Sequence, residues 1–215
     1  MPFNRDRAAL MISGLALFCF AAPAAAQPVF AGQDPTRPGY SFALTSGAAQ
    51  EDDSNAPPDD AVAASSPKTE QEINYPTTEA AGTVIVDTNS KHLYYVEGGG
   101  KAIQYGIGVG GEGFAWSGVA TVASKQEWPK WFPPPAMLQR HPELPTEMDG
   151  GLGNPLGARA LYLYEGKVDT QYRIHGTNEP DTIGQAVSSG CIRMMNSDVM
   201  DLYKRVPIGT KVVVL

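Results

Sequence analysis

From Thr83 onward the chain consists of short apolar segments separated by glycine-containing turns, and this pattern restricts the fold more than any other feature. Strand-forming residues occupy 83–86 and 93–96, and three consecutive glycines at 98–100 separate the second segment from a third. In that third segment every second residue is apolar: Ile103, Tyr105, Ile107 and Val109. A period of two is typical of a half-buried strand, so a sheet that begins with a hairpin is expected.

The pattern of apolar and turn residues also predicts further strands and one helix. Strands are expected at 118–124, 161–164, 172–175 and 211–215, with a turn at 165–167. The helix is expected near 197–206, where Asn196 or Ser197 can cap its start. One face of this helix is apolar, and Pro207 and Gly209 end it. Residues 80–215 are therefore predicted to form a mainly β domain with a short helix near its end.

A segment rich in tryptophan and proline interrupts the strands. It begins at Trp128, contains Trp131 and Phe132 followed by three prolines, and continues to the glycines at 150–153. Proline lacks an N–H donor and fixes φ, so a regular strand or helix is not expected here. We expect a stiff aromatic loop that either walls a substrate groove or covers an edge of the core. Trp131 is the groove candidate.

The first 26 residues match the three-part pattern of a secretory signal peptide. Arg5 and Arg7 precede an apolar run that reaches about residue 22, and small residues follow at 23–26. The run is shorter than the roughly 20 residues that span a bilayer. Cleavage after Ala26 and export to the periplasm are expected. Cys19 would be removed with this peptide, which leaves Cys191 as the only cysteine of the mature chain.

Residues 27–79 are predicted to be a flexible linker. Prolines recur throughout, large apolar residues are few, and acidic residues cluster at 51–53 and 59–60. Such a segment cannot bury enough apolar surface to offset the entropy that ordering would cost. It is interpreted either as a tether that gives the domain reach or as a tolerated extension.

Composition excludes some classes of protein. The chain of 215 residues has a net charge of −7, with 23 acidic and 16 basic residues, which argues against nucleic acid as a partner. Two cysteines rule out a disulfide-rich scaffold and a four-cysteine zinc site. Gly108, Gly110 and Gly113 match a dinucleotide-binding pattern, but no helix start follows them. They are interpreted as a turn between strands.

The residues that point to chemistry are His175 and Cys191. A thiolate is a strong nucleophile, and a nearby imidazole can take the thiol proton and later return one to a leaving amine. The small residues Ser188, Ser189 and Gly190 leave backbone N–H groups open to an oxyanion. Arg193 points to the same side as Cys191 if the chain is extended, and it can hold a substrate carboxylate.

Two less specific interpretations remain open at this point. A lone cysteine is often a small buried apolar residue, and a lone histidine is often structural. A metal site is not expected, because the one remaining cysteine and the three histidines lack ligand spacing.

The segments around these residues resemble a known family. His175-Gly176-Thr177 is followed by Asn-Glu-Pro, then Ile183-Gly184, then Ser-Ser-Gly-Cys-Ile-Arg-Met at 188–194. This combination resembles the signature of the L,D-transpeptidases of the YkuD (ErfK/YbiS/YcfS/YnhG) family. The resemblance covers about residues 80–215 and includes 153–161 and the Trp-Pro segment. Many members have histidine where this chain has Ser189, which leaves the acceptor preference open.

The resemblance implies a fold and a reaction. The fold is a β-rich sandwich, and no cofactor is expected. Cys191 would be the nucleophile, His175 the base and the Gly176 carbonyl the group that orients the imidazole. The donor would be a peptidoglycan tetrapeptide stem, which Cys191 attacks at diaminopimelate to release D-alanine. The acceptor amine would belong to a diaminopimelate, giving a 3→3 cross-link, to a lipoprotein lysine or to a free D-amino acid.

The resemblance also implies inhibition by carbapenems. Trp131, Tyr162 and Arg159 are positional guesses for groove residues, and a structural role for Arg159 is equally expected. Two alternatives to a transpeptidase remain. One is an exported cysteine hydrolase or carboxypeptidase that acts on peptidoglycan stems. The other is a domain that binds peptidoglycan without chemistry.

Overall fold

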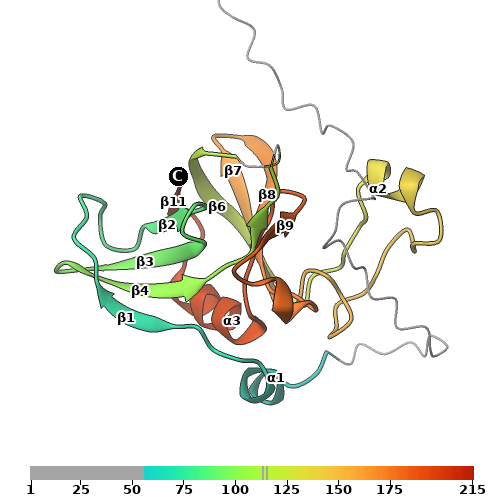
Figure 1. The fold of residues 1–215 in the computed structure, drawn as a ribbon, viewed down its shortest axis with the longest axis horizontal. Helices are drawn as coiled ribbons and strands as arrows, with labels where there is room; N and C mark the ends of the chain where they lie inside the picture. Colours follow the sequence, from blue (N-terminus) through green and yellow to red (C-terminus); the bar gives the residue numbers. More distant parts are fainter. Residues whose placement is uncertain (1–55, 113, 115) are drawn as a thin grey trace, which may run out of the picture.

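The computed structural model describes residues 56–112, 114 and 116–215. Its helices are α1 (Asp59–Ser65), α2 (Pro135–Arg140) and α3 (Asn196–Arg205), with one 3-10 turn at Pro180–Thr182. The strands are β1 (Gln71–Asn74), β2 (Val84–Asp87), β3 (His92–Gly98), β4 (Lys101–Gly106), β5 (Val109–Gly110), β6 (Gly118–Glu127), β7 (Arg159–Glu165), β8 (Val168–His175), β9 (Ala186–Ser188), β10 (Ile192–Arg193) and β11 (Lys211–Val214). The expected mainly β fold with a short helix is confirmed (Figure 1).

Nine strands form one sheet in the order β1-β4-β3-β2-β11-β6-β7-β8-β10, and β5 pairs with β9 separately. The C-terminal strand β11 lies at the centre, parallel to β2 and antiparallel to β6. It therefore joins the hairpins of the first half of the domain to the strands that carry the site. At the far edge β10 runs parallel to β8.

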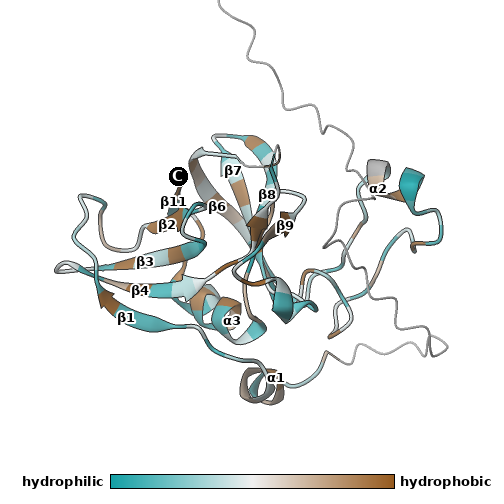
Figure 2. Cartoon of the chain, viewed as in Figure 1, coloured by the Kyte–Doolittle hydropathy of each residue, from teal (hydrophilic) through white to brown (hydrophobic). Residues whose placement is uncertain are grey.

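The core lies between the two halves of the sheet and α3. Its buried side chains come from β2 to β8, from β10 and β11 and from α3, and the largest include Tyr105, Leu93, Leu161 and Leu202. Since residues from both halves share one cluster, the sheet must curve round it. Figure 2 shows hydrophobic residues interleaved with hydrophilic ones along the strands. This is the period of two on which the strand predictions rested.

The strand predictions agree closely with the structure, and the hairpin turns at the predicted glycines. Gly98, Gly99 and Gly100 all have positive φ, which only glycine adopts without strain. The predicted helix cap is wrong. Met195 is the N-cap and makes no side-chain capping bond. The Asn196 carboxamide is engaged elsewhere, as described below. Within the pattern at 108–113, residues 109–110 form β5.

The Trp-Pro segment differs from the expectation in one respect, because it contains α2. This helix starts at Pro135 and follows directly on Pro134. Proline is tolerated in the first turn of a helix, where its missing N–H has no intrahelical partner. The segment has a small core of its own around Trp131, Met137 and Leu144. Buried Asn154 fastens it by donating to the carbonyls of Pro129, Met148 and Asp149.

The end of the predicted linker is folded. We call residues 58–74, which contain α1 and β1, the N-terminal strap. Its Val62 is buried with Ala158 and Met200, and β1 pairs with β4 at the sheet edge. The linker prediction overlooked this because the strap is held mainly by polar contacts. The predicted signal peptide and the linker up to residue 55 lie outside the described residues.

Candidate active site

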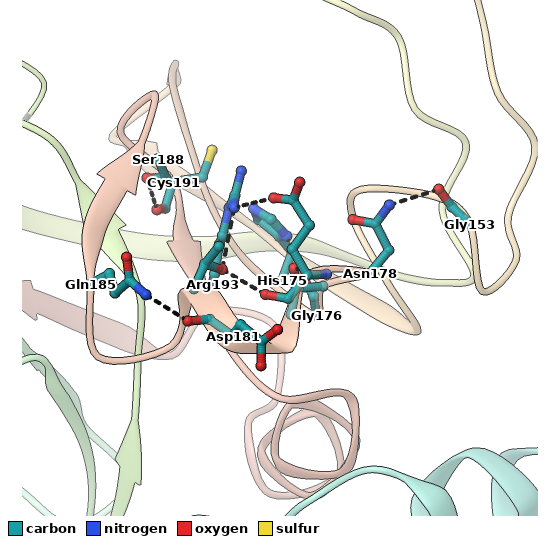
Figure 3. A network of polar contacts seen from close by, with 12 residues as sticks. Gly153, His175, Gly176, Asn178, Asp181, Gln185, Ser188, Cys191 and Arg193 are labelled. Carbon is teal, nitrogen blue, oxygen red and sulfur yellow. Dashed lines mark hydrogen bonds and ion pairs between the residues drawn. The ribbon is translucent and has the colours of Figure 1, made fainter. Parts of the chain in front are cut away.

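The parallel pairing of β8 and β10 brings Cys191 and His175 to one pocket. Arg193 lies opposite His175 in this pairing, Cys191 directly precedes β10, and His175 ends β8. Figure 3 shows Cys191, Arg193 and His175 along these two strands. The pocket is lined by apolar residues of the Trp-Pro segment and of its continuation (Trp131, Pro134, Met137, Pro155, Leu156), and by residues around the two strands (His175, Asn178, Glu179, Val187, Ser188, Ser189, Cys191, Arg193).

His175 is held as a neutral imidazole with a defined tautomer. Its ring is buried, and Nδ1 lies 2.5 Å from the carbonyl oxygen of Gly176. A carbonyl only accepts, so Nδ1 must carry the proton, and Nε2 is left as the proton acceptor. Burial, and then the positive charge of Arg193, lower the pKa of His175 to about 3. The ring is therefore uncharged at neutral pH.

Cys191 is a free thiol immediately before β10. Its Sγ lies 3.9 Å from the carbonyl oxygen of Gln171. Desolvation raises the pKa of the thiol, and a backbone hydrogen bond and the charges of Arg173 and Arg193 only partly oppose this. The resting site thus holds a neutral thiol and a neutral imidazole.

The backbone before Cys191 makes a strained turn that requires glycine. Gly190 has a φ of +123°, and a Cβ there would lie 2.7 Å from the ring of Tyr172. Ser188 Oγ donates to the Cys191 carbonyl at 2.6 Å and accepts from the Gly190 N–H at 3.2 Å. The Gly190 N–H is thus already engaged, which differs from the expectation of an open oxyanion donor. The N–H of Ser189 remains the predicted donor from this turn.

Arg193 lines the pocket as expected, but it is already paired. Its Nη1 donates to Glu179 Oε2 at 2.8 Å and to Thr182 Oγ1 at 3.3 Å. A carboxylate that approaches Arg193 therefore meets a guanidinium that Glu179 partly neutralises. The role of Arg193 as a substrate clamp stays a prediction.

Two of the three guessed groove residues lie outside the pocket. Tyr162 bonds to Gln126 through its hydroxyl and lies against the Arg173 guanidinium. Its neighbours Leu161 and Leu163 take the core-facing positions of β7, so the alternation of the strand sends Tyr162 to the other face. Tyr162 therefore does not line the pocket that holds Cys191. Arg159 is buried and pairs with Asp59 of the strap, which makes it structural. Trp131 does line the pocket.

Sequence reasoning missed Asn196, which connects three segments behind His175. Its Oδ1 accepts from the N–H groups of Ala158 and Thr177 at 3.0 and 3.2 Å, and its Nδ2 donates to the Thr177 carbonyl at 3.0 Å. Nothing local in the sequence distinguishes this role from helix capping. Glu179 was also missed as a pocket residue.

Within the part of the chain that the structure describes, no three His, Cys, Asp or Glu residues come together as a metal site requires. In the same part, no helix is long and apolar enough to cross a membrane.

Comparison with known protein families shows to which family the chain belongs. The YkuD model, described as an L,D-transpeptidase catalytic domain, matches residues 81–214. This chain belongs to the YkuD family. The match covers β2 to β11, the Trp-Pro segment and every pocket residue, and it confirms the family resemblance seen in the sequence.

Curated relatives of this YkuD-family chain include the "Probable L,D-transpeptidase ErfK/SrfK" of Escherichia coli K12, 36% identical over 67% of this chain. The "Probable L,D-transpeptidase YbiS" of the same strain is 34% identical over 66%. In both cases the match covers 47% of the relative, so the chain spans about half their length. A solved structure from Brucella melitensis, described as a probable carnitine operon oxidoreductase, is 47% identical, with a TM-score of 0.48 over 71% of this chain and 98% of that one.

Proposed function

We propose that this chain is a peptidoglycan L,D-transpeptidase with Cys191 as nucleophile and His175 as general base. The observation that carries the proposal is the fixed tautomer of His175 in the pocket that also holds Cys191. With the Nδ1 proton committed to the Gly176 carbonyl, only Nε2 can accept the thiol proton. Membership in a family of L,D-transpeptidase catalytic domains supplies the class of reaction.

The pKa directions indicate when the proton moves. A raised thiol pKa and a lowered imidazole pKa disfavour a preformed thiolate–imidazolium pair. The thiol proton therefore moves to Nε2 as Sγ attacks the carbonyl carbon. At that moment the negative charge that develops on the substrate oxygen stabilises the positive charge on the imidazolium. Trp131, Met137 and Leu156 give the pocket an apolar wall, and electrostatic interactions are stronger in apolar surroundings than in water.

The reaction then has two steps. Cys191 Sγ forms a bond to the diaminopimelate carbonyl carbon of a tetrapeptide stem, the amide bond to D-alanine breaks, and the thiol proton leaves on the D-alanine amine by way of His175. An acceptor amine next attacks the thioester, gives a proton to His175 and restores the Cys191 thiol. A diaminopimelate amine would give a 3→3 cross-link, and a lipoprotein lysine would give an anchored lipoprotein.

The proposed substrate lies outside the cytoplasm. The signal-peptide pattern at residues 1–26 supports export, and the periplasm is the proposed location.

The test is intact-mass analysis of the reduced protein after mixing with a carbapenem. A stable adduct on the wild type and none on Cys191→Ser would support the assignment. No adduct on folded, reduced protein would contradict it. Incubation with tetrapeptide stems and an added amine then separates transfer from hydrolysis, because only transfer incorporates the amine. Turnover by Cys191→Ala would overturn the thioester mechanism.

A further inference from the structure

Apart from His175 and Cys191, the pocket lining contains only two ionisable side chains, Glu179 and Arg193, and they carry opposite charges. They form an ion pair, and their side chains are 22% and 16% exposed. The rest of the lining is apolar or neutral. Among the residues that line the pocket, these two are therefore the ones that can pair with a charged ligand.

In addition to the ion pair, the backbone of each partner is held by hydrogen bonds of its own. The Arg193 N–H and carbonyl each bond to Gly108 at 2.9 Å. The Glu179 N–H donates to Thr177 Oγ1 at 2.9 Å, and its carbonyl accepts from Thr182. The backbone at both positions would therefore stay in place if a ligand came between the two side chains. Such preorganisation is what a binding site needs.

The pair leaves hydrogen-bonding capacity on both sides. The bonds described use Nη1 of Arg193 and Oε2 of Glu179. Among the described residues, Nη2 and Nε of Arg193 and Oε1 of Glu179 have no hydrogen-bond partner. A guanidinium offers five donors and a carboxylate offers about four acceptor positions, so each group can hold a second charged partner.

A ligand with a single charge is poorly suited to this arrangement. A carboxylate alone would be attracted by Arg193 and repelled by Glu179, and an ammonium alone would meet the reverse. A ligand end with both groups on one carbon presents each charge to its opposite and adds no net charge to the pocket.

We propose that Glu179 and Arg193 form a subsite for an amino-acid end, in which Glu179 binds the ammonium and Arg193 binds the carboxylate. This inference rests on the proposed function, because the side-chain end of diaminopimelate carries both groups. It assigns Glu179 a role in specificity and makes Arg193 one half of a paired receptor.

The test compares three tetrapeptides that differ only in the third residue: meso-diaminopimelate, 2-aminopimelate, which lacks the side-chain ammonium, and lysine, which lacks the side-chain carboxylate. Binding is measured by calorimetry on the full chain with Cys191→Ser, so turnover is not needed. We expect the diaminopimelate peptide to bind at least tenfold more tightly than either of the others.

Two variants in that background should change the preference in opposite directions. Glu179→Gln should abolish the preference over the 2-aminopimelate peptide, because no carboxylate then remains to bind the ammonium that distinguishes the two peptides. Arg193→Gln should abolish the preference over the lysine peptide. Asp181→Asn is the matched control, since this exposed carboxylate lies two residues from Glu179 and outside the pocket lining. It should change nothing.

A merely structural ion pair predicts equal losses for all three peptides in both variants, and that result would overturn the subsite. So would a wild-type preference below twofold. Carbapenem acylation and stem turnover by the Cys191 enzyme are measured separately. Selective binding without acylation or turnover would leave the subsite standing and reject the proposed reaction. Acylation and turnover without selective binding would reject the subsite and leave the proposed reaction standing.

Discussion

The carboxamide of Asn196 brackets Thr177, accepting a hydrogen bond from its N–H and donating one to its carbonyl. The same Oδ1 also accepts from the Ala158 N–H. One side chain at the start of α3 thus holds the loop that follows His175 against the start of β7. The Gly176 carbonyl that orients the imidazole belongs to this loop.

The fit around Asn196 explains why glycine stands at two neighbouring positions. A Cβ at Gly176 or at Gly157 would overlap the Asn196 Oδ1. Gly157 also has a φ of +62°, which a residue with a side chain rarely adopts. The imidazole, the Gly176 carbonyl and Asn196 therefore form a single positioned unit.

Replacing Asn196 with alanine should slow acylation of Cys191 by a carbapenem at least tenfold. The loop would lose three hydrogen bonds, and His175 would lose its fixed orientation. Loss of stability should be about 1–3 kcal/mol, since buried backbone groups lose a partner. Acylation is measured by mass spectrometry and stability by urea unfolding.

The control for that variant is Asn89→Ala, at an exposed turn outside the lining of the pocket. It should leave acylation unchanged. The pH dependence of acylation separates positioning from general destabilisation. If the imidazole is misplaced, the acylation rate should depend on pH only through the fraction of Cys191 present as thiolate, and so should rise with pH. An Asn196→Ala profile parallel to the wild type, at an unchanged rate, would contradict the positioning role.

The rate of Cys191 alkylation by iodoacetamide should keep rising above pH 8.5, the ordinary region for a cysteine pKa. Desolvation raises the pKa of this thiol, and the thiolate is the reacting form. The rate is measured by the appearance of modified mass across pH 5 to 10. A plateau reached below pH 7 would indicate a thiolate–imidazolium pair and contradict the neutral resting site.

His175 should also couple folding to pH. Its pKa is about 3 in the folded chain and about 6.5 when unfolded, so below pH 6.5 the unfolded state binds a proton that the folded state does not. The contribution of His175 to the free energy of unfolding is therefore fully present above pH 6.5. Below that pH it falls by roughly 1.4 kcal/mol per pH unit.

The measurement is the free energy of unfolding of the wild type and of His175→Gln between pH 7 and pH 4.5. The difference between the two chains should shrink from the neutral to the acid end by about 2.5 kcal/mol, while carboxylate effects cancel. Parallel curves would mean that the folded chain accepts the proton on His175 near its ordinary pKa.

The sequence predicts those parts of this fold that depend on local pattern. The alternation of Ile103 and Tyr105 and the hairpin glycines are local signals, and they predict β4 and its turn correctly. His175 and Cys191 were identified because their segments carry a specific motif. Asn196 and Tyr162 were misjudged because their roles depend on which chain segment lies opposite. That information comes from the parallel β8–β10 pairing and the β7 register, which no short window contains.

The N-terminal strap is a second part of the fold that local sequence does not predict. Residues 58–74 are polar and rich in small residues, and the sequence predicts a linker there. They are nevertheless fastened by long-range bonds. Thr69 bonds to the buried Asp198 through its N–H and hydroxyl, and Ser197 Oγ donates to the Pro67 carbonyl. These contacts reach the first turn of α3, next to Asn196.

A chain that begins at residue 80 should therefore be less stable and less active than one that begins at residue 56. Without the strap, Asp198 loses its Thr69 partners, Arg159 loses Asp59, and β4 becomes an unpaired edge. Leaving a buried carboxylate without its hydrogen bonds alone costs about 1–3 kcal/mol. Because Asn196 begins the same helix, acylation of Cys191 should slow as well.

Thermal unfolding and carbapenem acylation of the two chains provide the measurement. Thr69→Val in the longer chain is the matched variant, since it keeps the strap and removes the hydroxyl's bonds to Asp198 and to the Gly106 N–H. It should reproduce part of the loss in stability and leave β1 paired. If the chain from residue 80 unfolds at the same temperature and is acylated at the same rate as the longer chain, the strap is dispensable, and the folded unit begins where the linker prediction placed it.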